Sequence, residues 1–171
     1  MHKLIFLIGA SGSGKTATAR ILESKKLLHL RICYFDSIGI PSNQEMIKEY
    51  GSLDGWQKAK TTEWVKTIKV NYLQMVDVIL DGQTRPLFIE ESCDAAKIKL
   101  YEIILFDCSD KIRNQRLIAR GHVEIANETM INWANYLRRE CISRGCKVID
   151  TSDLTIEQSV SRLILAIGDF K

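Results

Sequence analysis

An eight-residue segment near the start of the chain has the residue types and the spacing that phosphate chemistry requires. The segment reads Gly9-Ala10-Ser11-Gly12-Ser13-Gly14-Lys15-Thr16 and matches G-x-x-x-x-G-K-[ST] in full. Glycines let the backbone curl with its N–H groups pointing inward, and the N-terminus of a following helix adds about half a positive charge. In such a loop Lys15 is expected to reach the β- and γ-phosphates, and the Thr16 hydroxyl to ligate Mg²⁺. The segment therefore predicts a nucleoside triphosphate site.

Charged side chains also stand where apolar runs of the chain end. Asp36 follows the second such run, Asp81 ends the third, and Arg85 comes four residues later. Ligands of open α/β sheets bind at the carboxyl ends of the strands, so these side chains are candidates for a substrate or metal site. The alternative for either aspartate is a helix or turn cap, and for the arginine a solvated surface position.

Two further arginines, Arg116 and Arg120, lie four residues apart in a helical segment. They are expected to share one face of that helix, where two cations repel each other unless an anion lies near them. The spacing predicts a clamp on the γ-phosphate, and the alternative is an exposed basic face.

Short apolar runs alternate with helical patterns and must position these side chains. Strands are expected over residues 3–8, 28–35, 76–80, 100–106 and 148–150. Helices are expected over residues 14–25, 42–50, 53–73, 86–97, 109–120, 128–144 and 155–167, with capping boxes at Ser42 and Thr155. Strands separated by helices predict a three-layer α/β sandwich with a five-stranded parallel sheet.

The composition is that of one ordinary globular domain. The chain has 171 residues, 46% of them apolar, and 24 Lys and Arg against 21 Asp and Glu give a net charge of +3. This charge is too mild to indicate a nucleic-acid partner. Five cysteines, an odd number without a Cys-x-x-Cys pair, favour the reducing cytoplasm over a disulfide scaffold or a zinc site. No run approaches the ~20 apolar residues of a membrane span, so a soluble protein with no membrane partner is expected.

Three segments, in order, resemble the nucleoside-monophosphate kinases, and adenylate kinase in particular. Val78-Ile79-Leu80-Asp81-Gly82-Gln83-Thr84-Arg85 resembles an apolar run followed by Asp-Gly-Phe-Pro-Arg, with Gln83-Thr84 in place of Phe-Pro. Arg113-Asn114-Gln115-Arg116-Leu117-Ile118-Ala119-Arg120-Gly121 resembles the helix that enters the arginine-bearing lid. Val148-Ile149-Asp150-Thr151-Ser152 resembles the last strand and the loop beside the nucleotide base.

The resemblance implies a P-loop kinase fold with strand order 2-3-1-4-5, occupying residues 1–171 as one domain with a short lid at about 121–127. It implies transfer of the γ-phosphate of ATP, with Mg²⁺, to a small acceptor, first of all a nucleoside monophosphate. Asp81 would meet Mg²⁺ through water, and Arg85 would grip the acceptor phosphate. Arg138, on the helix after the lid, would reach the acceptor. The nucleotide contacts would include Thr151 and Ser152.

Other functions stay open at this point. In related kinases that act on hydroxyl groups, an acid at the position of Asp36 orients or deprotonates the acceptor. The acceptor would then be a nucleoside, a sugar, an antibiotic or a polynucleotide 5′ end, the last being the only nucleic-acid partner expected. A nucleotide-dependent regulatory or binding ATPase is an alternative of another class. The chain has no Asn-Lys-x-Asp guanine motif, which favours ATP over GTP. The tryptophans, Trp56, Trp64 and Trp133, are expected to pack in the core.

Overall fold

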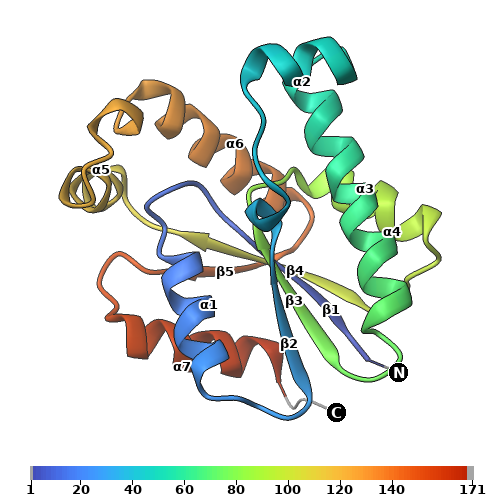
Figure 1. Ribbon diagram of the computed structural model, residues 1–171. Coiled ribbons are helices and arrows are strands. Elements are labelled where there is room, and N and C mark those ends of the chain that lie inside the picture. Colours follow the sequence, from blue (N-terminus) through green and yellow to red (C-terminus); the bar gives the residue numbers. More distant parts are fainter. Residues whose placement is uncertain (1, 169–171) are drawn as a thin grey trace.

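A single five-stranded parallel sheet forms the centre of the molecule. The computed structural model describes residues 2–168 and is drawn in Figure 1. The strands are β1 (Leu4–Ile8), β2 (Leu30–Tyr34), β3 (Asp77–Gly82), β4 (Tyr101–Asp107) and β5 (Lys147–Asp150). They lie in the order β2-β3-β1-β4-β5, and each adjacent pair is parallel. The predicted fold class and strand order are therefore confirmed.

Helices cover both faces of this sheet (Figure 1). The helices are α1 (Lys15–Ser24), α2 (Asn43–Tyr50), α3 (Leu53–Asn71), α4 (Pro86–Ala95), α5 (Asp110–Ala119), α6 (Glu128–Ser143) and α7 (Ile156–Ile167). Two short 3-10 turns are η1 (Phe35–Ile38) and η2 (Val123–Ile125). The capping boxes predicted at Ser42 and Thr155 are both present, at the N-termini of α2 and α7.

The sheet divides the core in two because successive strand residues point to opposite faces. From β1, Leu4, Phe6 and Ile8 join one cluster, to which α3, α4 and α6 contribute. Ile5 and Leu7 join the other cluster, with residues from α1 and α7. All five β1 residues are buried, which explains why the first run of the sequence is continuously apolar.

Two differences from the predicted boundaries bear on the site, because they lie at the carboxyl ends of β2 and β3. β3 continues to Gly82, where the sequence predicts an end at Leu80. β2 ends at Tyr34, and the next residues form η1 because the chain turns there, with the Gly39 N–H donating to the Asp36 carbonyl. Asp81 therefore lies within the sheet, opposite Leu7 of β1 and Tyr34 of β2. Asp36 lies in a turn just beyond its strand.

The structure also places the tryptophans and cysteines. Trp56 is buried in the core, whereas Trp64 and Trp133 are partly buried and pack against it. The cysteines are free thiols. Among residues 2–168, no helix combines the length and apolar character that crossing a membrane requires.

Candidate active site

The predicted phosphate loop connects β1 to α1 at the carboxyl edge of the sheet. Gly12 and Gly14 have φ angles of 83° and 90°, which side-chain-bearing residues rarely adopt. A Cβ on Gly9 would lie 2.3 Å from the carbonyl oxygen of Phe106 in β4. These glycines are therefore required by the path of the loop, which curls tightly against the end of the sheet.

Lys15, the first residue of α1, is buried beneath this loop with 8% of its surface exposed. Burial lowers the pKa of its ammonium group, although the carboxylates of Asp81 and Asp36 counteract this shift. Arg120 and Arg113 lower the pKa of Lys15 further, because like charges disfavour its protonation. The site thus holds a desolvated cation that an anionic ligand would stabilise.

Thr16 and Asp81 form the second feature of the site. The Thr16 hydroxyl donates to Oδ2 of Asp81 over 2.7 Å. The other carboxylate oxygen, Oδ1, is buried and accepts no hydrogen bond from the residues that the structure describes. Burial raises the pKa of Asp81, while Lys15 and the Thr16 hydroxyl oppose that rise. A hydroxyl beside an orphaned carboxylate oxygen is a set of hard oxygen donors that fits Mg²⁺.

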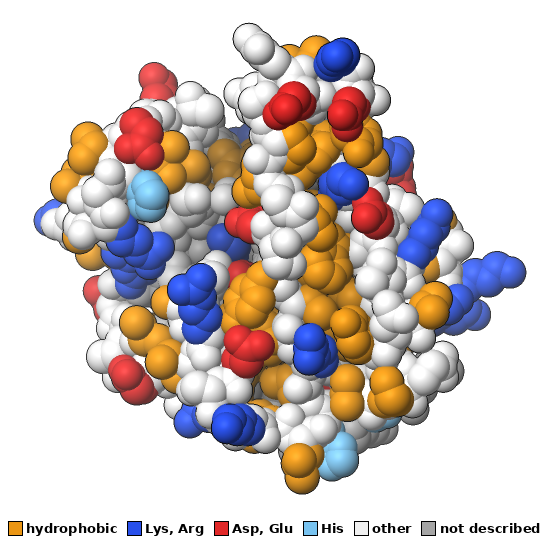
Figure 2. Space-filling view, in the orientation of Figure 1, with side chains coloured by type: hydrophobic (Ala, Val, Ile, Leu, Met, Phe, Trp, Pro, Cys, Tyr) orange, Lys and Arg blue, Asp and Glu red, His pale blue; other side chains and the backbone are white. Residues whose placement is uncertain are grey.

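A pocket of about 300 Å³ brings several predicted residues together. Its walls come from the phosphate loop, from Asp36 of η1, from Arg120 at the end of α5, and from His122 and Ile125 of the predicted lid. Figure 2 shows the molecule hollowed between the side that carries α5 and α6 and the side that carries α2 and α3, with Lys and Arg side chains beside the hollow. Asp36 makes no hydrogen bond or ion pair that would occupy its exposed carboxylate elsewhere in the described chain.

The two arginines of the predicted clamp have different surroundings. Arg120 follows the last residue of α5 and lines the pocket. Arg116 is committed to the loop after β5, because its guanidinium donates to the Thr151 hydroxyl over 2.9 Å and to the Thr151 carbonyl over 2.7 Å. A third, longer bond of 3.4 Å reaches the carbonyl of Gly12. Arg116 therefore joins the phosphate loop to the loop predicted to run beside the base.

The side chains of Thr151 and Ser152 are engaged within the protein. Thr151 is buried, and its hydroxyl donates to the carbonyl of Ser13 over 2.8 Å. The Ser152 hydroxyl donates to Asp150 and accepts from the backbone N–H of Ser109. Both side chains thus fix the position of their loop against the phosphate loop and the start of α5.

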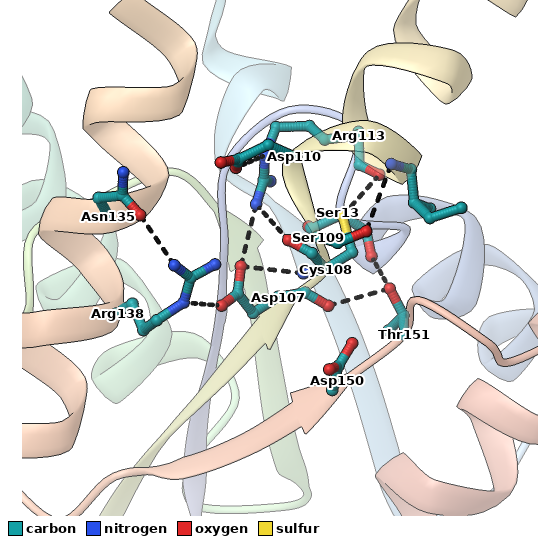
Figure 3. A network of polar contacts seen from close by, with 12 residues as sticks. Ser13, Asp107, Cys108, Ser109, Asp110, Arg113, Asn135, Arg138, Asp150 and Thr151 are labelled. Carbon is teal, nitrogen blue, oxygen red and sulfur yellow. Dashed lines mark hydrogen bonds and ion pairs between the residues drawn. The ribbon is translucent and has the colours of Figure 1, made fainter. Parts of the chain in front are cut away.

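Asp107, the last residue of β4, is the centre of a buried charge network (Figure 3). Its Oδ1 accepts from Nη2 of Arg113 over 3.0 Å, and its Oδ2 accepts from Nε of Arg138. Arg138, predicted to bind substrate, also donates to Oδ1 of Asn135 over 2.8 Å. The structure therefore places Arg138 in an ion pair that ties α6 to the sheet, and it is not among the residues of the pocket.

Asp107→Asn is expected to lower the free energy of unfolding by about 3–5 kcal/mol, because fully buried Arg113 would lose its close charge partner. Urea unfolding measures this change. Asp110→Asn is the matched control, since Asp110 lies 3.9 Å from Arg113 and is partly exposed. A change in Asp107→Asn as small as that in the control would contradict the role assigned to Asp107.

Arg85, at the N-cap of α4, has polar and aromatic partners within the protein. Its Nη2 lies 2.8 Å from Oδ1 of Asp54, and its Nη1 donates to Oε1 of Gln57 over 2.9 Å. Its guanidinium carbon also lies 4.9 Å from the ring centroid of Trp133 and 5.4 Å from that of Tyr136. The two rings are stacked on each other. The positive charge of Arg85 is thus compensated inside the protein.

Sequence reasoning did not assign the neighbours of Arg85 to the site. Asp54 and Gln57 lie in the first turns of α3, and Trp133 and Tyr136 lie on α6, far from Arg85 in the chain. The spacing of Trp133 and Tyr136 by three residues places them on one helix face, which is the only local signal that they act together. The sequence has no pattern that pairs this face with Arg85.

Comparison with solved structures finds the same fold in small kinases. A sugar kinase from Janibacter sp. HTCC2649 aligns with a TM-score of 0.67 and 14% identity, over 98% of this chain and 95% of that one. The shikimate kinase of Acinetobacter baumannii, solved with shikimate, aligns with a TM-score of 0.64 and 14% identity, over 98% of this chain and 93% of that one. The shikimate kinase of Bacteroides thetaiotaomicron aligns with a TM-score of 0.61 and 14% identity, over 94% of this chain and 95% of that one.

A family model covers most of the chain. The model describes an AAA domain (AAA_18) and matches residues 5–132, from β1 to the first part of α6. The matched segment contains the phosphate loop, Asp36, Asp81, Arg85 and both arginines of the predicted clamp. No curated protein sequence matches the chain. The chain belongs to the AAA domain family and has the P-loop kinase fold.

Proposed function

We propose that this protein is a phosphotransferase that moves the γ-phosphate of ATP, with Mg²⁺, to a small acceptor bearing a hydroxyl group. The observation that carries the proposal is a pocket lined by buried Lys15, by Thr16, whose hydroxyl is bonded to Asp81, and by the exposed Asp36. The first three suit a magnesium nucleotide. The fourth, Asp36, would be a general base beside the nucleotide.

Different groups of the site would bind the phosphates and the metal ion of the nucleotide. Inward-facing backbone N–H groups and the N-terminus of α1 would bind the phosphates, and Lys15 would contact the β- and γ-phosphates. Thr16 and Asp81 would hold Mg²⁺, which neutralises charge on the β- and γ-oxygens when bound. Arg120, which lies at the end of α5 just before the short lid at about residues 121–127, would bind the γ-phosphate.

The base side of the nucleotide is assigned to the loop after β5. Thr151 and Ser152 would present the backbone of this loop to the base, since their side chains hold it in place. Arg116, which is bonded to Thr151, lies between this loop and the phosphate loop. We therefore assign Arg116 to the nucleotide and leave the γ-phosphate to Arg120.

Asp36 would act on the acceptor. Its carboxylate would accept the proton of the acceptor hydroxyl while that oxygen bonds to the γ-phosphorus. The bond between the γ-phosphorus and the bridging oxygen then breaks, and ADP leaves. The kinases of the same fold are named for a sugar and for shikimate, both of which carry hydroxyl groups. This agreement supports a small hydroxylated acceptor.

A nucleoside monophosphate is the second candidate, and Arg85 is the observation that favours it. Its partner Asp54 has a side chain that is 57% exposed, so an acceptor phosphate would have room to replace that carboxylate. The hydroxyl acceptor is preferred because Arg85 is already neutralised by Asp54 and held by Gln57. In this alternative Asp36 would have no proton to accept, because the attacking group is a phosphate oxygen.

A comparison of two variants on one acceptor panel separates the candidates. The panel contains nucleosides, sugars, shikimate, an aminoglycoside, a 5′-hydroxyl oligonucleotide, and AMP, CMP and UMP. For a hydroxyl acceptor, Asp36→Asn is expected to lower kcat by about 10²–10⁴-fold, as loss of a general base does. The affinity of the Asp36→Asn variant for ATP should change little, since Asp36 contacts no phosphate in this mechanism.

The control is Asp94→Asn, an exposed aspartate at the end of α4 that should behave as the wild type. If transfer occurs only to AMP, CMP or UMP and collapses in Arg85→Ala while Asp36→Asn stays active, the monophosphate acceptor replaces the hydroxyl acceptor.

A further inference from the structure

One side chain outside the predicted site, Gln83, connects the phosphate loop to α6. Gln83 follows the last residue of β3, and it lines the same pocket as the phosphate loop. Its Nε2 donates to Oγ of Ser11 over 3.0 Å. Its Oε1 accepts from the indole Nε1 of Trp133 over 3.0 Å. A single amide thus spans two elements that lie far apart in the sequence.

The chemistry of the partners fixes the orientation of this amide. An indole N–H can only donate, so the Gln83 oxygen must face Trp133 and its NH₂ must face Ser11. The Ser11 oxygen therefore accepts from Gln83, and its own O–H donates to none of residues 2–168. Because Ser11 is a wall of the nucleotide pocket, this O–H is available to a phosphate oxygen.

The backbone of Gln83 is held as firmly as its side chain. Its carbonyl accepts from Nε2 of Gln57, and Gln57 in turn accepts from Arg85. Arg85 lies over the ring of Trp133. The backbone carbonyl of Gln83 is therefore connected, through Gln57 and Arg85, to the same tryptophan that its side chain contacts. Two hydrogen bonds thus connect Ser11 to Trp133 through one side chain.

We propose that Gln83 is a positioning residue that aims the Ser11 hydroxyl at the bound nucleotide and links occupancy of the phosphate loop to Trp133 of α6, beside Arg85. The proposal rests on the proposed nucleotide site and adds a residue whose contact with the phosphates is indirect. If nucleotide binding changes the affinity for an acceptor held near Trp133, that acceptor must change the affinity for the nucleotide by the same factor.

The test uses the full chain labelled with ¹⁵N, in which each tryptophan gives one indole N–H signal. The Trp133 signal is assigned by its disappearance in Trp133→Phe, and ADP with Mg²⁺ is the probe. We expect saturation with the probe to shift the Trp133 signal in the wild type and to leave the signal of core residue Trp56 in place. In Gln83→Met the shift at Trp133 is expected to disappear.

Isothermal calorimetry on the same samples measures the affinity. Gln83→Met is expected to weaken ADP binding about 5- to 10-fold, the equivalent of one hydrogen bond. Gln74→Met, an exposed glutamine just after α3, is the matched control and should retain both the affinity and the shift. Ser11→Ala is the second variant, because it keeps the Gln83–Trp133 bond yet should also lose the response of Trp133.

The outcomes separate this inference from the proposed function. Calorimetric binding without any shift at Trp133 in the wild type would overturn the inference alone. A full shift in Gln83→Met or Ser11→Ala would also overturn it. An absence of nucleotide binding in the wild type would overturn the proposed function, and the role of Gln83 with it.

Discussion

Lys15→Met is expected to lower kcat for phosphoryl transfer at least about 100-fold, the loss typical of a charge-stabilising donor removed from a transition state. Lys15 is the buried cation beneath the phosphate loop, and a methionine of similar length keeps its packing without the charge. Steady-state assays with saturating ATP and Mg²⁺ measure the effect on the acceptor that the panel identifies.

The fold is expected to survive this substitution. Burial lowers the pKa of Lys15, so the protonated amine is disfavoured in the folded protein relative to the unfolded chain. The resulting loss of stability is complete below the lowered pKa and disappears only above the ordinary pKa, so the ligand-free protein carries it at neutral pH. Lys15→Met should therefore have an equal or higher Tm. A lower Tm with retained transfer would contradict both parts of the prediction.

Asp81→Asn is expected to lower kcat about 10²–10³-fold at a Mg²⁺ concentration that saturates the wild type. The amide keeps a hydrogen-bond partner for the Thr16 hydroxyl but removes the negative charge that would hold the metal. The concentration of Mg²⁺ needed for half-maximal activity should rise, and added Mg²⁺ should restore part of the activity. An unchanged Mg²⁺ requirement would contradict the assignment of Asp81.

The pH dependence of Asp81 follows from the same burial. Burial raises the pKa of Asp81 in the folded protein. The protonated carboxyl therefore stabilises the fold fully at a pH below the ordinary pKa, and this stabilisation is lost as the pH rises through the raised pKa. Asp81→Asn should accordingly raise the Tm of the metal-free protein at neutral pH. Protons compete with Mg²⁺ for the carboxylate, so the Mg²⁺ requirement of the wild type should increase as the pH falls through the raised pKa. In Asp81→Asn this pH dependence should be absent.

The sequence predicted the parts of the molecule that depend on local pattern. Continuous apolar runs identified the buried strands, and the capping boxes at Ser42 and Thr155 identified two helix starts because both signals lie within a few residues. The phosphate loop was predicted for the same reason, because its glycines, lysine and threonine lie within eight consecutive residues. The boundaries of β2 and β3 were less accurate, since strand ends depend on the neighbours that the sheet provides.

The contacts of the site depend on pairs of residues that are distant in the chain. Nothing near Arg138 indicates that it pairs with Asp107, and nothing near Arg85 indicates Asp54 or Trp133. A resemblance to kinases supplied candidate arginines but not their partners, and the partners decide whether a cation is free to bind a phosphate. The distinction between Arg120 in the pocket and Arg116 on the loop after β5 likewise required the structure.

The fate of the γ-phosphate tests the central proposal most directly. The wild-type protein is incubated with [γ-³²P]ATP, Mg²⁺ and the acceptor panel, and the labelled products are separated, with Lys15→Met as the control. We predict that the label appears on a hydroxylated small molecule, that ADP forms in equal amount, and that Lys15→Met gives almost no labelled product. Label found only in inorganic phosphate, at a rate that no acceptor changes, would contradict the proposal and indicate a regulatory ATPase.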